Sequence, residues 1–135
     1  MKAPVWIDER RALAIHQRVL GLHGGAAGLR DRALLESALA RPRQHYAYAS
    51  AGKPDILAMA ALYASGIVRN HPFLDGNKRT GFVVGILFLE LNGYRFTASE
   101  EESALAVMAL AAGTLDEEDF AAFLRANAKT RRAKG

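Results

Sequence analysis

Hydrophobic residues recur at helical spacing along most of the chain. The clearest stripe repeats at intervals of three and four residues and consists of Ile56, Met59, Ala60, Tyr63 and Ile67. This is the spacing of one face of an amphipathic helix. Pro54 and Asp55 suit its start, and Pro72 requires it to end near Asn70. The pattern therefore predicts a helix between Asp55 and Asn70.

Two helices are predicted before this one. Asp8 can cap the first, which ends at Gly21 and the loop HGGAAG. Asp31 can cap the second, and Pro42 should end it because the residue before a proline is pushed out of helical geometry. The positions predicted to face inward are Ala12, Ile15, Val19 and Leu22 in the first helix, and Leu34, Leu35, Ala38 and Leu39 in the second. Residues 44–53 have no clear period, so we predict an exposed loop or short hairpin there.

The stretch from Asn77 to Leu91 is apolar on nearly every side. Its apolar members are Phe82, Val83, Val84, Ile86, Leu87, Phe88, Leu89 and Leu91. A helix that is apolar all round is typically buried, so we place this one at the centre of the fold. Gly93 is expected to end it.

The C-terminal part predicts two more helices after a short extended piece at 94–97. Ser99 and Glu102 match a capping box for a helix through Ala112, and Asp116 can cap the last helix. The inward positions of that helix are Phe120, Phe123 and Leu124. The whole pattern predicts an all-α fold of six helices and no sheet.

The composition fits one ordinary domain. The chain has 135 residues, 50% of them hydrophobic and none of them cysteine, which excludes disulfide scaffolds and cysteine-ligated metal sites. Its longest strongly apolar stretch, 81–91, is about half of the roughly 20 residues that a membrane-spanning helix needs. The first residues show no signal-peptide pattern. We therefore expect a cytoplasmic protein without a membrane partner.

The net charge of +4 comes from the last seven residues. The segment 129–135, KTRRAKG, holds four cations, and residues 1–128 carry 14 positive and 14 negative charges. Short basic ends are usually solvated and frayed. We therefore predict a single domain over residues 1–128, a disordered basic tail over 129–135, and no direct binding of nucleic acid.

One stretch, HPFLDGNKRT at 71–80, concentrates reactive groups just before the central helix. A loop through Gly76 and Asn77 that enters a helix points unpaired backbone N–H groups outward, at the positive end of the helix dipole. Lys78 and Arg79 are unfavourable for the helix in its first turn, and a bound anion explains them better. The stretch therefore predicts a phosphate site.

Two further side chains complete a candidate catalytic set. Asp75 offers a hard oxygen ligand for a Mg²⁺ that bridges phosphate oxygens, and His71 can act as a general base. Each group also has an ordinary explanation when taken alone. His71 can fill a helix C-terminus, Asp75 can be a helix N-cap, and the two cations can be a solvated face. Phe73 is expected to be a core anchor. Together the polar groups predict phosphoryl or nucleotidyl transfer.

The stretch resembles the signature of the death-on-curing (Doc) toxins of the Fic/Doc superfamily. The segments GLRDRALLESALARPR at 28–43 and FLELNGYRF at 88–96 are also similar to that family, and the resemblance covers most of residues 5–125. It implies a compact six-helix Fic/Doc fold with a central buried helix after the HPFLDGNKRT loop. It also implies the toxin of a toxin–antitoxin system, a kinase that uses ATP to phosphorylate a threonine of elongation factor Tu and blocks translation.

The resemblance implies a role for each polar residue of the loop. His71 would take the proton from the target hydroxyl, and Asp75 would hold Mg²⁺. The residues implied to bind phosphate are Gly76, Asn77, Lys78, Arg79 and Arg69, of which Lys78 and Arg79 also belong to the catalytic set. The stretch 46–53 lies where the superfamily has a flap that docks the target, and strand addition is the expected mode of docking.

Two other functions stay open. Fic-type AMP transfer ordinarily uses the motif HxFx(D/E)GNGRxxR, in which this chain has Lys78 in place of the second glycine and Phe82 in place of the second arginine. Both departures favour a kinase, because they remove a close backbone approach to phosphate and a phosphate ligand. A catalytically silent protein-binding module is the other alternative, and the retained polar residues of the loop argue against it.

Control of the activity is expected to come from another protein. Some Fic proteins carry an inhibitory helix with the pattern (S/T)xxxE(G/N), and this sequence has no convincing copy of it. The resemblance implies a Phd-type antitoxin whose disordered C-terminal segment folds as it binds a groove on the toxin.

Overall fold

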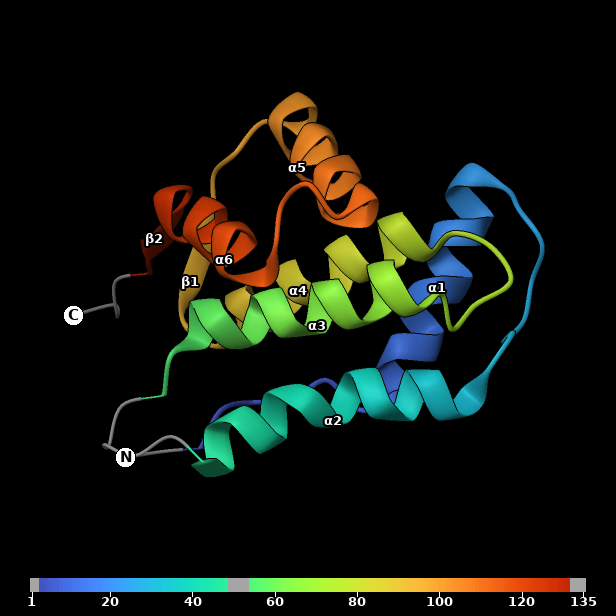
Figure 1. Cartoon of the computed structure of the whole chain (residues 1–135), viewed down its shortest axis with the longest axis horizontal. Coiled ribbons are helices and arrows are strands. Elements are labelled where there is room, and N and C mark those ends of the chain that lie inside the picture. The colour runs from blue at the N-terminus through green and yellow to red at the C-terminus, as the bar shows by residue number, and fades with distance from the viewer. Residues whose placement is uncertain (1–2, 49–53, 132–135) are drawn as a thin grey trace.

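The structure is a computed structural model that describes residues 3–48 and 54–131 (Figure 1). Within these residues it contains six helices and one two-stranded sheet. The helices are α1 (Glu9–His23), α2 (Arg32–Tyr48), α3 (Ile56–Asn70), α4 (Asn77–Leu91), α5 (Glu100–Ala112) and α6 (Glu117–Ala126). The strands are β1 (Tyr94–Phe96) and β2 (Ala128–Thr130). The prediction of a six-helix, mostly helical fold is confirmed.

Helices α3 and α4 share the centre of the molecule (Figure 1). Helix α3 is buried along nearly its whole length from Leu57 to Val68, because α2, α4, α5 and α6 all pack against it. Helix α4 buries one face, whose members are Asn77, Thr80, Gly81, Val84, Gly85, Phe88 and Leu89. The predicted central helix after the loop is therefore present, although only one face of it is fully buried and Val83 is exposed, and α3 is buried on more sides than its single apolar stripe predicted.

Glycines let α3 and α4 approach closely. A Cβ atom placed on Gly81 would lie 3.0 Å from the carbonyl oxygen of Ala64, and one on Gly85 would lie 3.0 Å from that of Ala60. These contacts are too short for an unstrained side chain, so only glycine allows the two backbones to meet this way. The end of α3 and the start of α4 are thereby fixed relative to each other.

The first helix is longer than predicted, and its inward face includes the predicted Ala12 and Val19 but not Leu22. Asp8 caps it as expected, since its Oδ1 accepts a hydrogen bond from the Arg11 backbone N–H at 2.9 Å. The helix continues past Gly21 to His23. Leu22, predicted to face inward, is 70% exposed, whereas His16 is buried in its place.

Helix α2 corrects a second prediction, because it continues through Pro42 to Tyr48. Tertiary contacts on the far side of the proline hold this continuation. The Arg43 guanidinium lies 4.9 Å from the centre of the Trp6 ring, and the Tyr46 ring packs edge-on against the same indole. Residues 44–48 are therefore helical rather than a loop, and residues 49–53 of the expected flap lie outside the described residues.

The C-terminal caps are confirmed, but the prediction of no sheet is wrong. Ser99 and Glu102 form the expected capping box, and Asp116 caps α6. Strand β2 pairs antiparallel with β1, with Arg95 opposite Lys129. The expected boundary at 128/129 thus falls inside a strand, and only residues 132–135 of the basic tail lie outside the described residues. No helix in the described part of the chain is long and apolar enough to cross a membrane.

Candidate active site

The HPFLDGNKRT loop joins the end of α3 to the start of α4 and lines a hollow of about 290 Å³. The residues around this hollow are His71, Leu74, Asp75, Gly76, Asn77, Lys78 and Arg79. The structure therefore brings together every predicted site residue except Arg69. The hollow is open to solvent at its polar side chains, because His71, Asp75, Lys78 and Arg79 are all exposed.

The start of α4 keeps its backbone donors available. Gly76 is the N-cap with φ +75°, and no side chain caps the helix. The N–H of Thr80 is bonded to the Gly76 carbonyl at 2.9 Å. The three earlier N–H groups, from residues 77–79, have no intrahelical partner because the residues one turn before them lie outside the helix. The first turn contains no acidic residue, so this end of the helix attracts an anion.

Asn77 holds the loop from inside. It is buried, its Oδ1 accepts from the Phe73 N–H at 3.0 Å, and its Nδ2 donates to the Phe73 carbonyl at 3.0 Å. The side-chain amide of Asn77 therefore holds the loop, and its backbone N–H is one of the three without an intrahelical partner. Phe73 is 1% exposed, which confirms it as the core anchor of the loop.

His71 has an unusual backbone conformation. It is the C-cap of α3, and with φ +53° it is the one non-glycine residue with a positive φ in the described part of the chain. Arg30 fixes this conformation by donating from Nε to the His71 carbonyl at 2.7 Å and from Nη2 to the Asn70 carbonyl at 2.8 Å. Arg30 was not singled out from the sequence, where its only signal was its place in the GLRD segment.

Asp75 points its carboxylate between two backbone N–H groups. Oδ1 accepts from the Gly76 N–H at 3.0 Å, and Oδ2 accepts from the Ala26 N–H at 3.2 Å. A Cβ atom on Gly25 would lie 3.0 Å from Oδ2, so the loop after α1 lies directly against the carboxylate. Within residues 3–48 and 54–131, no group of three or more His, Cys, Asp or Glu side chains could hold a metal ion.

The loop between α1 and α2 is joined to the HPFLDGNKRT loop by backbone hydrogen bonds. The Pro72 carbonyl accepts from the N–H of Arg30 at 2.7 Å and from that of Asp31 at 3.0 Å. The Leu74 N–H donates to the Gly28 carbonyl at 3.0 Å. The segment 24–31 therefore acts as a fixed support for the candidate site, and its connection to residues 72–74 was not predictable from either segment alone.

Arg69 lies apart from the hollow. It is exposed in the last turn of α3, and its guanidinium lies 3.7 Å from the position of a Cβ atom on Gly113, in the turn between α5 and α6. Its charge acts on Glu117. Burial works against the ionised form of Glu117, but the hydrogen bonds and charge of Arg41, aided by Arg69, hold the pKa of that carboxyl below its usual value.

The sequence of the site region matches a known family. A model of the Fic/DOC family matches residues 6–89, which include α1 to α3, the loop and most of α4. The chain belongs to the Fic/DOC family. A "Toxin Doc" from Mycolicibacterium smegmatis is 39% identical over 75 residues, which span 56% of this chain and 57% of that protein. A "Protein kinase doc" from Escherichia phage P1 is 31% identical over 119 residues, 88% of this chain and 92% of that protein.

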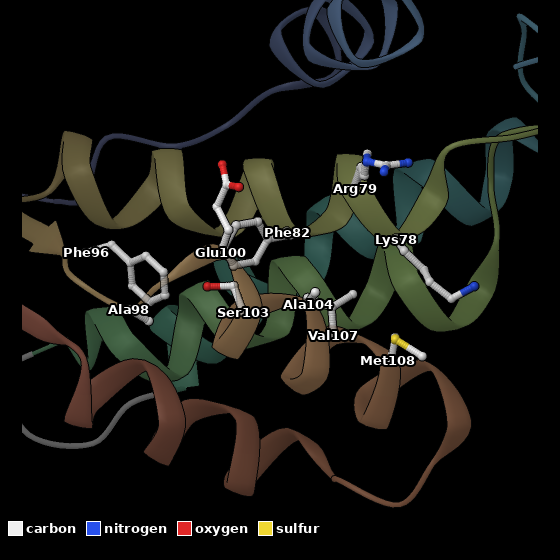
Figure 2. Close-up of a pocket in the computed structure, with 10 residues that line it drawn as sticks. All are labelled: Lys78, Arg79, Phe82, Phe96, Ala98, Glu100, Ser103, Ala104, Val107 and Met108. Carbon is white, nitrogen blue, oxygen red and sulfur yellow. The ribbon is translucent and has the colours of Figure 1, made fainter. Parts of the chain in front are cut away.

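The Fic/DOC loop of this chain also borders a second, apolar cavity of about 530 Å³ between α4, β1 and α5 (Figure 2). Its lining consists of Lys78, Arg79, Phe82, Phe96, Ala98, Glu100, Ser103, Ala104, Val107 and Met108. Lys78 and Arg79 line both spaces. Figure 2 shows the rings of Phe82 and Phe96 beside each other at the end of the cavity away from Lys78. The ring centres are 5.7 Å apart in an edge-on contact. Phe82 is thus part of an apolar wall.

Proposed function

We propose that this chain is the toxin of a toxin–antitoxin system and acts as a protein kinase. It transfers a phosphoryl group from ATP to a threonine of elongation factor Tu and so blocks translation. One observation carries the proposal: His71, Asp75, Lys78, Arg79 and the free N–H groups of α4 line a single hollow. The names of the two relatives, a toxin and a protein kinase, support it.

His71 is the proposed general base. Its imidazole is exposed at the hollow and takes the proton from the target hydroxyl as the oxygen bonds to the γ-phosphorus of ATP. The bond from that phosphorus to the bridging oxygen breaks, and ADP leaves. Charge develops on the phosphate oxygens during this step. The N–H groups at the start of α4, together with Lys78 and Arg79, stabilise that charge.

Asp75 is the proposed protein ligand of Mg²⁺. A single carboxylate fits this ion, because Mg²⁺ is commonly held by one or two carboxylates together with substrate phosphates and water. When bound, the ion would neutralise part of the phosphate charge. The Ala26 and Gly76 N–H groups aim the carboxylate, so its orientation is set before any substrate arrives.

The apolar cavity beside the hollow is the proposed place of the adenine base. A site for a flat aromatic group is typically apolar with few polar groups, and the rings of Phe82 and Phe96 form one end of this cavity. Lys78 and Arg79 line both spaces, so a base in the cavity has its phosphates beside the start of α4.

Fic-type AMP transfer is the second candidate. It is favoured because Lys78 and Arg79 line both the hollow and the cavity, so that a nucleotide lying across both spaces could present its α-phosphorus to the hydroxyl. Two features support the kinase instead. Lys78 puts a side chain where AMP transferases of this family ordinarily have a glycine, and Phe82 packs against Phe96 where they have a second arginine.

A mass measurement separates these functions. Purified elongation factor Tu is incubated with the chain, ATP and Mg²⁺, and its intact mass is compared with that from a His71→Asn reaction. Asn suits the control because it tolerates a positive φ. We expect a gain of one phosphoryl group that disappears in His71→Asn. A gain of one AMP group would establish the second candidate, and no gain, or a gain that survives His71→Asn, would overturn the proposal.

A second arm tests the place of the base. Ala104→Trp fills the cavity from the exposed face of α5, so it should leave the core intact. We expect the KM for ATP to rise about tenfold with little change in kcat, because uniform binding is lost. An unchanged KM would exclude the base from this cavity.

A Phd-type antitoxin is the proposed partner. The sequence has no copy of the inhibitory pattern (S/T)xxxE(G/N), so a separate protein is needed to silence an active toxin. Co-purification of the chain with such an antitoxin should suppress product formation in the same mass measurement.

A further inference from the structure

His16 is a buried polar group that the proposed chemistry does not use. It lies in the middle of α1, 59 residues before Asp75, and is 3% exposed. Its Nε2 is 2.8 Å from the Asp75 carbonyl oxygen. Because a carbonyl oxygen can only accept, Nε2 carries the hydrogen and donates it.

The His16 imidazole also contacts Phe73, which lies two residues before Asp75. The imidazole stacks on the Phe73 ring with centres 3.8 Å apart and planes 10° apart. A Cβ atom on Gly76 would lie 3.8 Å from Nε2, so α1 lies directly beneath the start of α4. The His16 side chain therefore contacts the HPFLDGNKRT loop at Phe73 and Asp75 and lies against Gly76.

An apolar side chain could fill this space but could not replace the hydrogen bond. The Asp75 carbonyl and the Gly76 N–H belong to one planar peptide unit, so holding the carbonyl also fixes the direction of that N–H. The Gly76 N–H in turn donates to Oδ1 of Asp75 at 3.0 Å. The hydrogen bond from His16 is thereby linked to the direction of the carboxylate.

We propose that His16 is a positioning residue, which holds the Asp75–Gly76 peptide plane and so aims the Asp75 carboxylate and the start of α4 into the hollow. Its effect on turnover rests on the proposed function. Its effect on the loop does not, because the contacts exist without any substrate. Residues that orient a metal-binding side chain typically contribute 10- to 100-fold in metal affinity or activity.

Three variants separate the hydrogen bond from packing. His16→Phe keeps a ring against Phe73 but removes the donor, whereas His16→Gln keeps an N–H donor on a side chain of similar reach. His45→Phe makes the same change at an exposed histidine in α2 and serves as the matched control. We expect His16→Phe to lower kcat or Mg²⁺–ATP affinity by about 10- to 100-fold, His16→Gln to restore most of it, and the control to equal the wild type.

Amide hydrogen exchange gives a readout that needs no turnover. The Gly76 N–H should exchange faster in His16→Phe and at nearly the wild-type rate in His16→Gln, with α5 and α6 unchanged in both. Equal behaviour of the Phe and Gln variants in exchange and in Mg²⁺–ATP binding would overturn the proposal, because packing alone would then explain His16.

The two proposals can fail separately. If wild-type protein modifies no target, the proposed function fails, and the exchange rate of Gly76 still decides the role of His16. If His16→Phe does not fold, His16→Met against His16→Gln gives the same comparison of an apolar and a donating side chain.

Discussion

Helices α4 and α5 begin in opposite ways. At α5, the Ser99 hydroxyl accepts from the Glu102 N–H at 3.0 Å and the Glu102 carboxylate accepts from the Ser99 N–H at 3.2 Å. All residues of its first turn, 100–102, are acidic. At α4, glycine is the N-cap, no side chain bonds to the free N–H groups, and the first turn carries Lys78 and Arg79.

Helix α6 begins like α5. Its N-cap Asp116 accepts from the Asp119 N–H at 2.8 Å, and its first turn is again acidic. At α5 and α6, then, a side chain of the protein accepts from a backbone N–H of the first turn, and acidic residues place negative charge at the positive end of the helix dipole. At α4 it does neither, which gives up local helix stability and leaves the donors for an external anion.

The largest effect is expected when the first turn of α4 is given acidic residues like those of α5. In the double variant Lys78→Glu/Arg79→Glu, ATP loses two charged donors, each contributing about 1.5 to 3 kcal/mol. We expect kcat/KM for ATP to fall at least about a hundredfold, while the free energy of unfolding rises by roughly 0.3 to 1 kcal/mol per acid.

Steady-state kinetics and urea unfolding of the same preparation measure both effects. The control Lys78→Gln/Arg79→Gln should lose activity with a smaller gain in stability. A double acidic variant that is less stable than the wild type would contradict the contrast between the two helix starts.

The complementary change removes the cap of α5. Ser99→Ala deletes the hydroxyl that accepts from Glu102, and caps of this kind contribute typically about 1 kcal/mol. We expect the free energy of unfolding to fall by that amount with the chemical step unchanged, measured by urea unfolding and by product formation at saturating ATP. Glu101→Gln, an exposed change in the same turn, serves as the control. A loss of turnover in Ser99→Ala would mean that α5 does more than cover the cavity.

The smallest expected effect concerns the first residue of α6. Glu117 accepts from Arg41 at 2.6 and 2.9 Å, and its pKa is lowered in the folded protein because these bonds and charges outweigh burial. A lowered folded-state pKa contributes stability that is complete above the ordinary glutamate pKa and is lost as the pH falls through the lowered value. Since the side chains of Arg41 and Glu117 are 38% and 32% exposed, their ion pair should contribute less than about 1 kcal/mol to the free energy of unfolding.

Glu117→Gln measures this contribution. The difference in unfolding free energy between wild type and variant should be largest near neutral pH and shrink on acidification. Glu118→Gln, an exposed neighbour in the same turn, should show a smaller difference at every pH. If the difference in unfolding free energy between wild type and Glu117→Gln stays constant from neutral to acidic pH, the ion pair contributes nothing to stability.

The features that were predicted best from the sequence are those that depend only on residues close together in the chain. The predicted caps Asp8, Asp31, Ser99 and Asp116 all accept a backbone N–H three residues later, because a cap needs only a side chain and the next three residues. The grouping of the loop residues around one hollow was predictable for the same reason, since Asp75 to Arg79 are consecutive.

Features that depend on distant residues were missed. Helix α2 continues past Pro42 because Trp6 packs against Tyr46 and Arg43, 37 or more residues away in the sequence. His16 looks like an interruption of the apolar face of α1 until Asp75 is brought beside it. No periodicity signals such contacts, because they depend on how the helices pack.

The glycine contacts between α3 and α4 have a consequence for how new specificity can arise in this scaffold. The proposed general base, His71, lies at the end of α3 and the proposed anion site lies at the start of α4, and the backbones of these two helices are in close contact at Gly81 and Gly85. If the proposed function holds, the packing of these two helices sets the spacing between the proton acceptor and the phosphate. Surrounding segments can change to admit a different target or nucleotide while the distance that the chemistry requires is preserved.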